Sequence, residues 1–198
     1  MGNQMFQMAA LYAYAHQVNS GDFYFTDEKW FAGHEREIKK MFGDGITGEQ
    51  MIEAVSVHVR IGDFAFEPQA SFHGQLWKTD YYEQAVKLFP GSHFLVFCAN
   101  GDPEQNKKDQ DWCREYFTRL GVSFEMANTN DSIADMNKMA RCAHQIIANS
   151  SFSWWAAYLN PNPDKIVVCA EESYWCCDRL PRIRVPKAWK QIIPNQLV

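Results

Sequence analysis

The sequence predicts an α/β protein in which helices cover both faces of a parallel β-sheet. Apolar segments of strand length alternate with segments of helix length from residue 51 to about residue 169, and this alternation is typical of parallel sheets. Connections between the segments are mostly short, and right-handed crossovers restrict the topology further. Polar residues gather after the strands, at the edge where such sheets bind ligands. We therefore expect a Rossmann-like domain with one ligand cleft.

Length and composition limit the classes of protein to consider. The chain has 198 residues, enough for one ordinary domain or two small ones, and a net charge of −5 without a basic block, which disfavours nucleic acid as a partner. No apolar run reaches the length that spans a bilayer, and no signal peptide precedes Gly2. The six cysteines form no C-x-x-C pair, so we expect reduced, packed thiols rather than a zinc site. These features favour a cytoplasmic protein, with peripheral attachment to a membrane as an alternative.

Two parts are expected along the chain: a short N-terminal segment over residues 1–50 and the sheet domain over residues 51–198. In the first part, apolar side chains at three- and four-residue spacing predict a helix over residues 3–18. A short aromatic strand over residues 23–25, a helix over residues 35–42 and a glycine-rich loop follow.

The sheet domain begins with an alternating strand over residues 55–60. A long loop over residues 61–78 follows, and long loops inside compact domains are often functional. A helix over residues 79–88 comes next, and the tail beyond residue 180 is expected to wrap the surface. The remaining strands are expected at residues 93–98, 122–126, 145–148 and 165–169, and the remaining helices at residues 104–120, 132–142 and 151–159.

The segment His58-Val59-Arg60-Ile61-Gly62-Asp63 closes the first strand of the sheet domain. Strand alternation puts His58 and Arg60 on one face, and Arg60 stands at the end of the strand. Its guanidinium could form paired hydrogen bonds with phosphate oxygens and stabilise the charge on a departing diphosphate. The alternative is a structural ion pair with Asp63, which the short spacing suits equally. His58 is either a general base or a hydrogen-bonded core residue, and its residue type alone favours the core.

A polar turn joins the strand at 145–148 to an alanine-rich helix. It contains Asn149, Ser150 and Ser151, and Phe152 follows in the helix. A strand, a polar turn and a helix start together place backbone N–H groups and hydroxyls against an anionic ligand. The alternative is ordinary capping of the helix by serine, and a capped helix still points its amides at such a ligand. Phe152 could stack on a base or a ribose, or belong to the core.

Two other polar residues are candidates for ligand contacts. The carboxylate of Asp135 could accept both N–H groups on the edge of a guanine, or it could be a solvent-facing acid one turn from Lys138. The amide of Asn3, at the start of the first helix, could donate to a sugar or a phosphate, or be incidental to a helix cap. Further polar residues follow the other strands at Asn100, Asp102, Glu171 and Glu172.

In combination these stretches resemble the inverting α-1,2-fucosyltransferases of bacterial and viral type, glycosyltransferase family 11. The final block, from Ile147 to Leu159, is highly specific for the family. The matching segments occur in the family's order and comprise Gly2 to Gln7, Val57 to Asp63, Tyr81-Tyr82 with Ala85, Phe94 to Phe97, Asp135-Met136 with Met139, and Ile147 to Leu159.

The resemblance implies a donor domain of the GT-B type that transfers L-fucose from GDP-fucose to the 2-hydroxyl of a galactose-containing acceptor. It also implies inversion by direct displacement, with no metal and no cofactor beyond the donor substrate. By position, Arg60 would hold the diphosphate, Asn3 would face the reacting centre and Asp135 would contact guanine. A base must take the acceptor proton, and the choice between His58 and Asp63 stays open. The remaining donor-binding residues implied are Asn149, Ser150, Ser151 and Phe152.

Three features depart from the family pattern. Met1 precedes Gly2 directly, where family members carry a strand and a glycine-rich turn. The stretch between Gln7 and His58 is shorter than the family's usual first domain, so we expect a shortened acceptor-side part. Ile61 stands where the family carries a second arginine, which removes one positive charge from the diphosphate site. The alternative function is therefore a degenerate, non-catalytic protein that binds a nucleotide sugar or a glycan.

Overall fold

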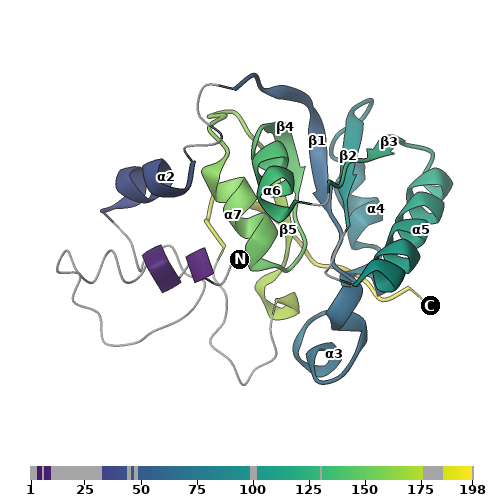
Figure 1. The fold of residues 1–198 in the computed structure, drawn as a ribbon. Coiled ribbons are helices and arrows are strands. Elements are labelled where there is room, and N and C mark those ends of the chain that lie inside the picture. Colours follow the sequence, from purple (N-terminus) through teal and green to yellow (C-terminus); the bar gives the residue numbers. More distant parts are fainter. Residues whose placement is uncertain are drawn as a thin grey trace.

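The protein is organised around one parallel β-sheet (Figure 1). The computed structural model describes residues 4–5, 7–9, 33–43, 46, 49–98, 102–129, 131–175 and 185–197. The six strands of the sheet have the order β3-β2-β1-β4-β5-β6, and every neighbouring pair is parallel. This is the strand order of dinucleotide-binding Rossmann domains. The expected α/β, Rossmann-like fold is confirmed.

Most predicted elements are present, with their ends shifted by a few residues. The strands are β1 (Ile52–His58), β2 (His93–Phe97), β3 (Ser123–Met126), β4 (Cys142–Ile146), β5 (Val167–Ala170) and β6 (Lys190–Ile192). The α-helices are α2 (Glu35–Gly43), α3 (Gln69–Phe72), α4 (Tyr81–Val86), α5 (Pro103–Arg119), α6 (Ser132–Ala140) and α7 (Ser151–Leu159). Three 3₁₀ turns are η2 (Gly62–Ala65), η3 (Leu76–Lys78) and η4 (Glu172–Tyr174).

The tail was expected to wrap the surface, but part of it joins the sheet. Residues 190–192 form β6, which pairs in parallel with β5 and extends the sheet. Three residues are too few to show an alternating pattern, and only Ile192 of the three is buried, so the sequence carries little signal for this strand. At the other end of the chain, residues 4–5 and 7–9 are helical. The rest of the helix expected over residues 3–18 and the strand expected over residues 23–25 lie outside the described residues, and the domain division at residue 50 stays a prediction.

The core consists of two apolar layers, one on each face of the sheet. Alternation along β2 shows the division: Leu95 and Phe97 belong to one buried cluster, whereas Phe94 and Val96 belong to the other. Helices α6 and α7 pack together over the first face, and α4 and α5 supply the second (Figure 1). Burial on both faces explains why β2 and β5 are almost continuously apolar instead of alternating with polar residues.

Helices α5, α6 and α7 each begin with a side-chain cap. Asp102, Asp131 and Ser150 precede α5, α6 and α7, and each accepts a hydrogen bond from an N–H in the first turn of its helix. Helix α5 also carries Pro103 at its first turn and is followed by Gly121 at a φ of +67°, which ends the helix. These three polar residues after the strands therefore cap helices, whether or not they also contact a ligand.

The order of the strands reverses at the centre of the sheet, between β1 and β4. The chain proceeds outward from β1 to β3 and then crosses back to β4 on the other side of β1. The connections that leave β1 and β4 diverge at this point, which is where open α/β sheets bind ligands. After β1, the segment with α3 projects beyond the sheet (Figure 1).

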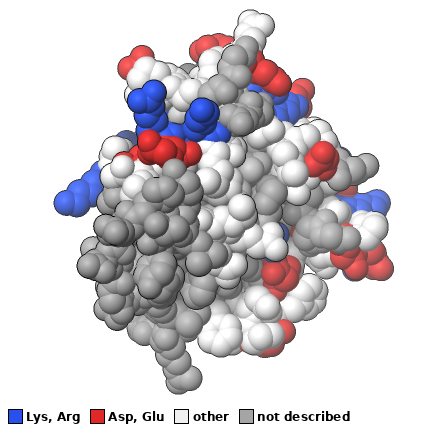
Figure 2. Space-filling view, turned by 60° about the vertical axis from the view of Figure 1, so that its left-hand side comes forward, with Lys and Arg blue, Asp and Glu red and all other residues white. Residues whose placement is uncertain are grey.

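Basic and acidic side chains are mixed on one face of the described part of the protein, and its four described cysteines are buried. In Figure 2, Lys and Arg side chains are interspersed with Asp and Glu side chains over the coloured part of the visible face. Cys98, Cys113, Cys142 and Cys169 are buried free thiols, whereas Cys176 and Cys177 fall outside the described ranges. Of the helices that the structure describes, none is long and apolar enough to cross a bilayer.

Candidate functional site

Arg60 and Asp63 meet at the carboxyl end of β1. Nη2 of Arg60 donates to Oδ1 of Asp63 at 2.5 Å, and the two side chains are 26% and 48% exposed. The guanidinium also lies over the ring of Phe64, 5.4 Å from its centroid. The structural ion pair considered from the sequence is therefore present. A solvent-exposed pair of this kind contributes little to stability, and the other guanidinium donors are not used by this contact.

The pair borders an open cleft of about 560 Å³. Lys108 and Glu104, which form their own ion pair at 2.8 Å, stand on its α5 side. Asp102, predicted to join Arg60 and Asp63 at one edge, does line the same cleft. The cleft is lined by Arg60, Gly62, Asp63, Phe66, Asp102, Glu104, Gln105 and Lys108.

Ile61 does not face this cleft. Its side chain is 7% exposed and packs in the apolar cluster on the α4 and α5 face. The position that carries a second arginine in the family pattern is here part of the core.

His58 lies beneath the start of α7. It is 4% exposed, and its Nδ1 is 2.9 Å from Oγ of Ser153. Burial, with a smaller contribution from the charge of Arg60, lowers the pKa of His58 from 6.5 to about 3, so the ring is neutral at physiological pH. The ring of Phe152 packs 5.4 Å away. The core interpretation matches this placement, and a role as general base stays a prediction.

Asn149 is turned into the protein. It is 3% exposed, and its Nδ2 donates to the carbonyl of Gly74 at 2.8 Å and to the carbonyl of Tyr174 at 2.6 Å. The amide therefore joins the loop after β1 to the segment after β5. Donor binding by Asn149 stays a prediction, but its side-chain nitrogen already has two partners.

Gly74 and His73 were not predicted and hold the same junction. The N–H of Gly74 donates to the carbonyl of Tyr174 at 2.9 Å, and a Cβ at Gly74 would lie 2.7 Å from that oxygen. Nδ1 of His73 is 2.8 Å from the carbonyl of Trp175, and its ring stacks on Phe64 at 4.1 Å. Nothing local reveals the contacts with Tyr174 and Trp175, because these two residues lie about a hundred residues further along the chain.

Ser150 is the N-cap of α7, which confirms the helix-capping interpretation of the polar turn. Its backbone is extended, with φ −137° and ψ 132°, and its Oγ accepts from the N–H of Phe152 at 3.3 Å. Ser151 and Phe152 are half-buried in the first turn. Binding of an anion at this helix start stays a prediction.

Asp135 supports the loop after β3. It is 5% exposed, and its Oδ1 accepts from the N–H of Thr129 at 2.7 Å. Asn128 contacts its other oxygen at 3.5 Å. The alternative of a solvent-facing acid one turn from Lys138 is wrong, because Asp135 is buried; Lys138 lies 3.9 Å from Glu125. Contact with guanine stays a prediction.

The structure brings the polar ends of β1 and β4 together, and some candidates lie elsewhere. Glu171 accepts from the N–H of Ser173 at 3.0 Å and so caps η4. Asn3 and Asn100 are outside the described residues. Within the described ranges, no cluster of three or more His, Cys, Asp or Glu side chains could hold a metal ion.

The chain is similar in sequence to known glycosyltransferases. The profile of glycosyl transferase family 11 matches residues 6–175. The O-antigen biosynthesis glycosyltransferase WbnK of Escherichia coli is 36% identical over 119 residues, which cover 57% of this chain and 36% of that protein. The alpha-1,2-colitosyltransferase of Escherichia coli is 30% identical over 151 residues, covering 69% of this chain and 49% of that protein. The galactoside 2-alpha-L-fucosyltransferase Sec1 of Mus musculus is 32% identical over 132 residues, covering 64% and 34%. The chain thus spans about a third to a half of the length of these relatives.

Proposed function

This chain belongs to glycosyl transferase family 11, and we propose that it transfers L-fucose from GDP-fucose to the 2-hydroxyl of a galactose-containing acceptor, with inversion. Similarity to proteins named as galactoside fucosyltransferases supports the sugar and the acceptor. The observation that carries the proposal is the position of Arg60 at the end of β1, the strand at which the sheet order reverses, on an open cleft between the segments that follow β1 and β2.

Arg60 is proposed to hold the diphosphate of the donor. Its guanidinium can form two parallel hydrogen bonds with phosphate oxygens, and an incoming diphosphate competes with the exposed carboxylate of Asp63 for it. The start of α7 is proposed to add backbone N–H groups beside the helix cap at Ser150. Asp135 is proposed to contact the guanine, and Asn3 the sugar.

In the proposed reaction the acceptor hydroxyl attacks the anomeric carbon directly. The bond between that carbon and the phosphate oxygen breaks, GDP leaves with the electron pair, and a protein base takes the acceptor proton. Asp63 is the better placed of the two candidate bases, because its carboxylate is 48% exposed on the cleft whereas His58 is 4% exposed. Freed from Arg60 by the diphosphate, the carboxylate could turn to the acceptor.

We further propose that protein groups alone neutralise the leaving diphosphate, without a metal. Arg60 and the N–H groups of α7 are the groups that support this. Transfer measured in excess EDTA is expected to match transfer in untreated protein. A loss that Mg²⁺ or Mn²⁺ restores would contradict it.

The second candidate is a binding protein that retains the donor site without turnover. The observation that favours it is Ile61, which is packed in the core and contributes no charge to the cleft.

A transfer assay separates the two functions. Radiolabelled GDP-fucose is incubated with a β-galactoside acceptor, and product is counted after removal of the donor. Labelled product supports the transferase, and binding of GDP-fucose without product supports the binding protein. If the protein neither binds nor uses GDP-fucose, but binds or uses GDP-mannose, the proposed donor is wrong.

A further inference from the structure

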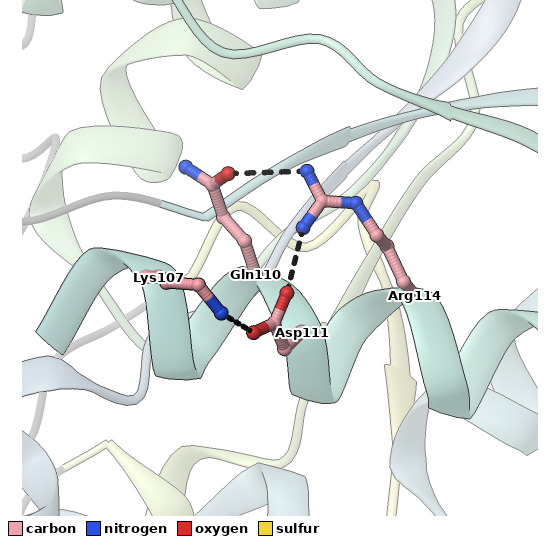
Figure 3. A network of polar contacts seen from close by, with 4 residues as sticks. All are labelled: Lys107, Gln110, Asp111 and Arg114. Atoms are coloured by element: carbon pink, nitrogen blue, oxygen red, sulfur yellow. Dashed lines mark hydrogen bonds and ion pairs between the residues drawn. The ribbon is translucent and has the colours of Figure 1, made fainter. Parts of the chain in front are cut away.

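Helix α5 carries two acids, two residues apart, that have opposite environments. Asp111 is 50% exposed and pairs with Lys107 at 2.5 Å and with Arg114 at 3.0 Å on the outer face of the helix (Figure 3). Asp109 is 3% exposed. Its Oδ2 accepts from the backbone N–H of Gly62 at 2.9 Å, and its Oδ1 accepts from Nε2 of Gln105 at 2.6 Å.

The bond to Gly62 reaches the peptide that separates Arg60 from Asp63. Gly62 begins η2 at a φ of +38°, a conformation that favours glycine. The first N–H groups of a helical turn have no partner within it, and the residue before this turn, Ile61, makes no side-chain cap. Asp109 therefore supplies, from a different element, the acceptor that the turn does not supply for itself.

We propose that Asp109 is a positioning residue for Arg60. Burial of a carboxylate is costly unless hydrogen bonds compensate it, so the bond to Gly62 is expected to be retained. With the core packing of Ile61, it fixes the peptide on which Arg60 and Asp63 stand and keeps both side chains on the cleft. Gln105, which lines the cleft, holds the second oxygen of the same carboxylate. The inference rests on the proposed function to the extent that the anion held by Arg60 is the donor diphosphate.

The test compares the affinities for GDP and for guanosine by calorimetry. Asp109→Ala is expected to lower the affinity for GDP about tenfold to a hundredfold, because misplacement of a binding group by about 1 Å has effects of this size. The affinity for guanosine is expected to stay unchanged. Asp109→Asn retains an oxygen that can accept from Gly62 and is expected to stay within about threefold of the native protein. The matched control, Asp111→Ala, removes the exposed acid of the same helix and is expected to change GDP affinity by less than about twofold.

A double-mutant cycle separates positioning from general support of the fold. In an Arg60→Ala background, Asp109→Ala is expected to have no further effect on GDP affinity, since it acts through Arg60. Additive losses, or an equal loss for guanosine, would overturn the proposal. If Asp109→Ala does not fold, Asp109→Glu displaces the carboxylate by one methylene and is expected to give the same selective loss.

Hydrogen exchange at the amide of Gly62 tests the anchor without any ligand. The amide is expected to be protected in the native protein and in Asp109→Asn, and to exchange at least about tenfold faster in Asp109→Ala. Fast exchange in the native protein would overturn the positioning role even if GDP binds. Failure of GDP to bind with the amide protected by Asp109 would instead count against the proposed function alone.

Discussion

The segments after β1 and after β4 start beside each other at the centre of the sheet and use their polar side chains in opposite ways. After β1, Arg60 and Asp63 are partly exposed on a cleft and bonded mainly to each other. After β4, Asn149 and Ser150 have their side chains occupied by backbone groups of the protein. The first segment keeps charge available to a ligand, and the second builds the support for it. A polar residue after a strand therefore does not identify a binding residue until its partners are known.

The largest expected effect is on the supporting side. Asn149→Ala removes two hydrogen bonds, to the carbonyls of Gly74 and Tyr174, although each carbonyl keeps a backbone N–H donor, from Leu76 and Gly74 respectively. A lost hydrogen bond costs about 0.5–1.5 kcal/mol, so we expect the free energy of unfolding to fall by about 1–3 kcal/mol, measured by urea denaturation with an unchanged slope. The control is Gln110→Ala, on the exposed face of α5 (Figure 3), which should stay within about 0.5 kcal/mol. If Asn149→Ala changes the free energy of unfolding as little as this control does, the segment after β4 does not have the supporting role that separates it from the segment after β1.

Arg60→Ala tests the ligand-facing side. Charge-assisted hydrogen bonds are worth about 1.5–3 kcal/mol, so GDP affinity should fall about tenfold to a hundredfold while guanosine affinity is retained. Stability should change by less than about 1 kcal/mol, since the pair with Asp63 is exposed. Lys108→Ala, in the same cleft but paired with Glu104, is the matched control for calorimetry. Equal losses for the two variants would show general attraction in the cleft instead of a specific contact.

His58 joins the two segments and is expected to make stability depend on pH. Its pKa in the folded protein is about 3, below the unfolded value of 6.5, so between these values the unfolded chain takes up a proton that the folded chain does not. The stabilisation is fully present above pH 6.5 and is lost as the pH falls toward 3, by about 2 kcal/mol at pH 5. Thermal unfolding of the native protein and of His58→Gln, compared at pH 7 and pH 5, measures this. If the difference in unfolding temperature between the native protein and His58→Gln is the same at pH 7 and pH 5, burial of the neutral ring is contradicted.

The smallest effect is expected at the cap of α7. Ser150→Ala removes the acceptor for the N–H of Phe152 and should lower the stability by about 1 kcal/mol. Ser150→Asp restores a cap and should recover the lost stability, but its negative charge should lower the affinity for GDP if the phosphates bind near this helix start. Recovery of stability with unchanged GDP affinity would place the phosphates away from this helix.

The sequence was sufficient for the fold because alternating apolar segments directly reflect a sheet covered on both faces. It was insufficient for β6, whose three residues are too short to show a period. The roles of Asn149 and Gly74 depend on Tyr174, which is distant in the chain and contributes a backbone carbonyl that has no residue signature. Asp109 stands in a helix with several other acids, and only its burial separates it from Asp111. Arg60 could be identified because it stands at the end of the first strand of the sheet, the edge at which parallel sheets bind ligands.

The central claim is that the donor binds at the carboxyl ends of the strands, on the segment after β1. Backbone amide shifts recorded by NMR during a titration with GDP test it directly. The amides of Gly62 and Asp63 and those at the start of α7 are expected to move together and to saturate at one affinity. A second hollow, of about 740 Å³ between Phe89–Ser92 and Leu120–Ser123, lies at the amino ends of β2 and β3. Shifts confined to that hollow, or none at either end of the sheet, would contradict the claim.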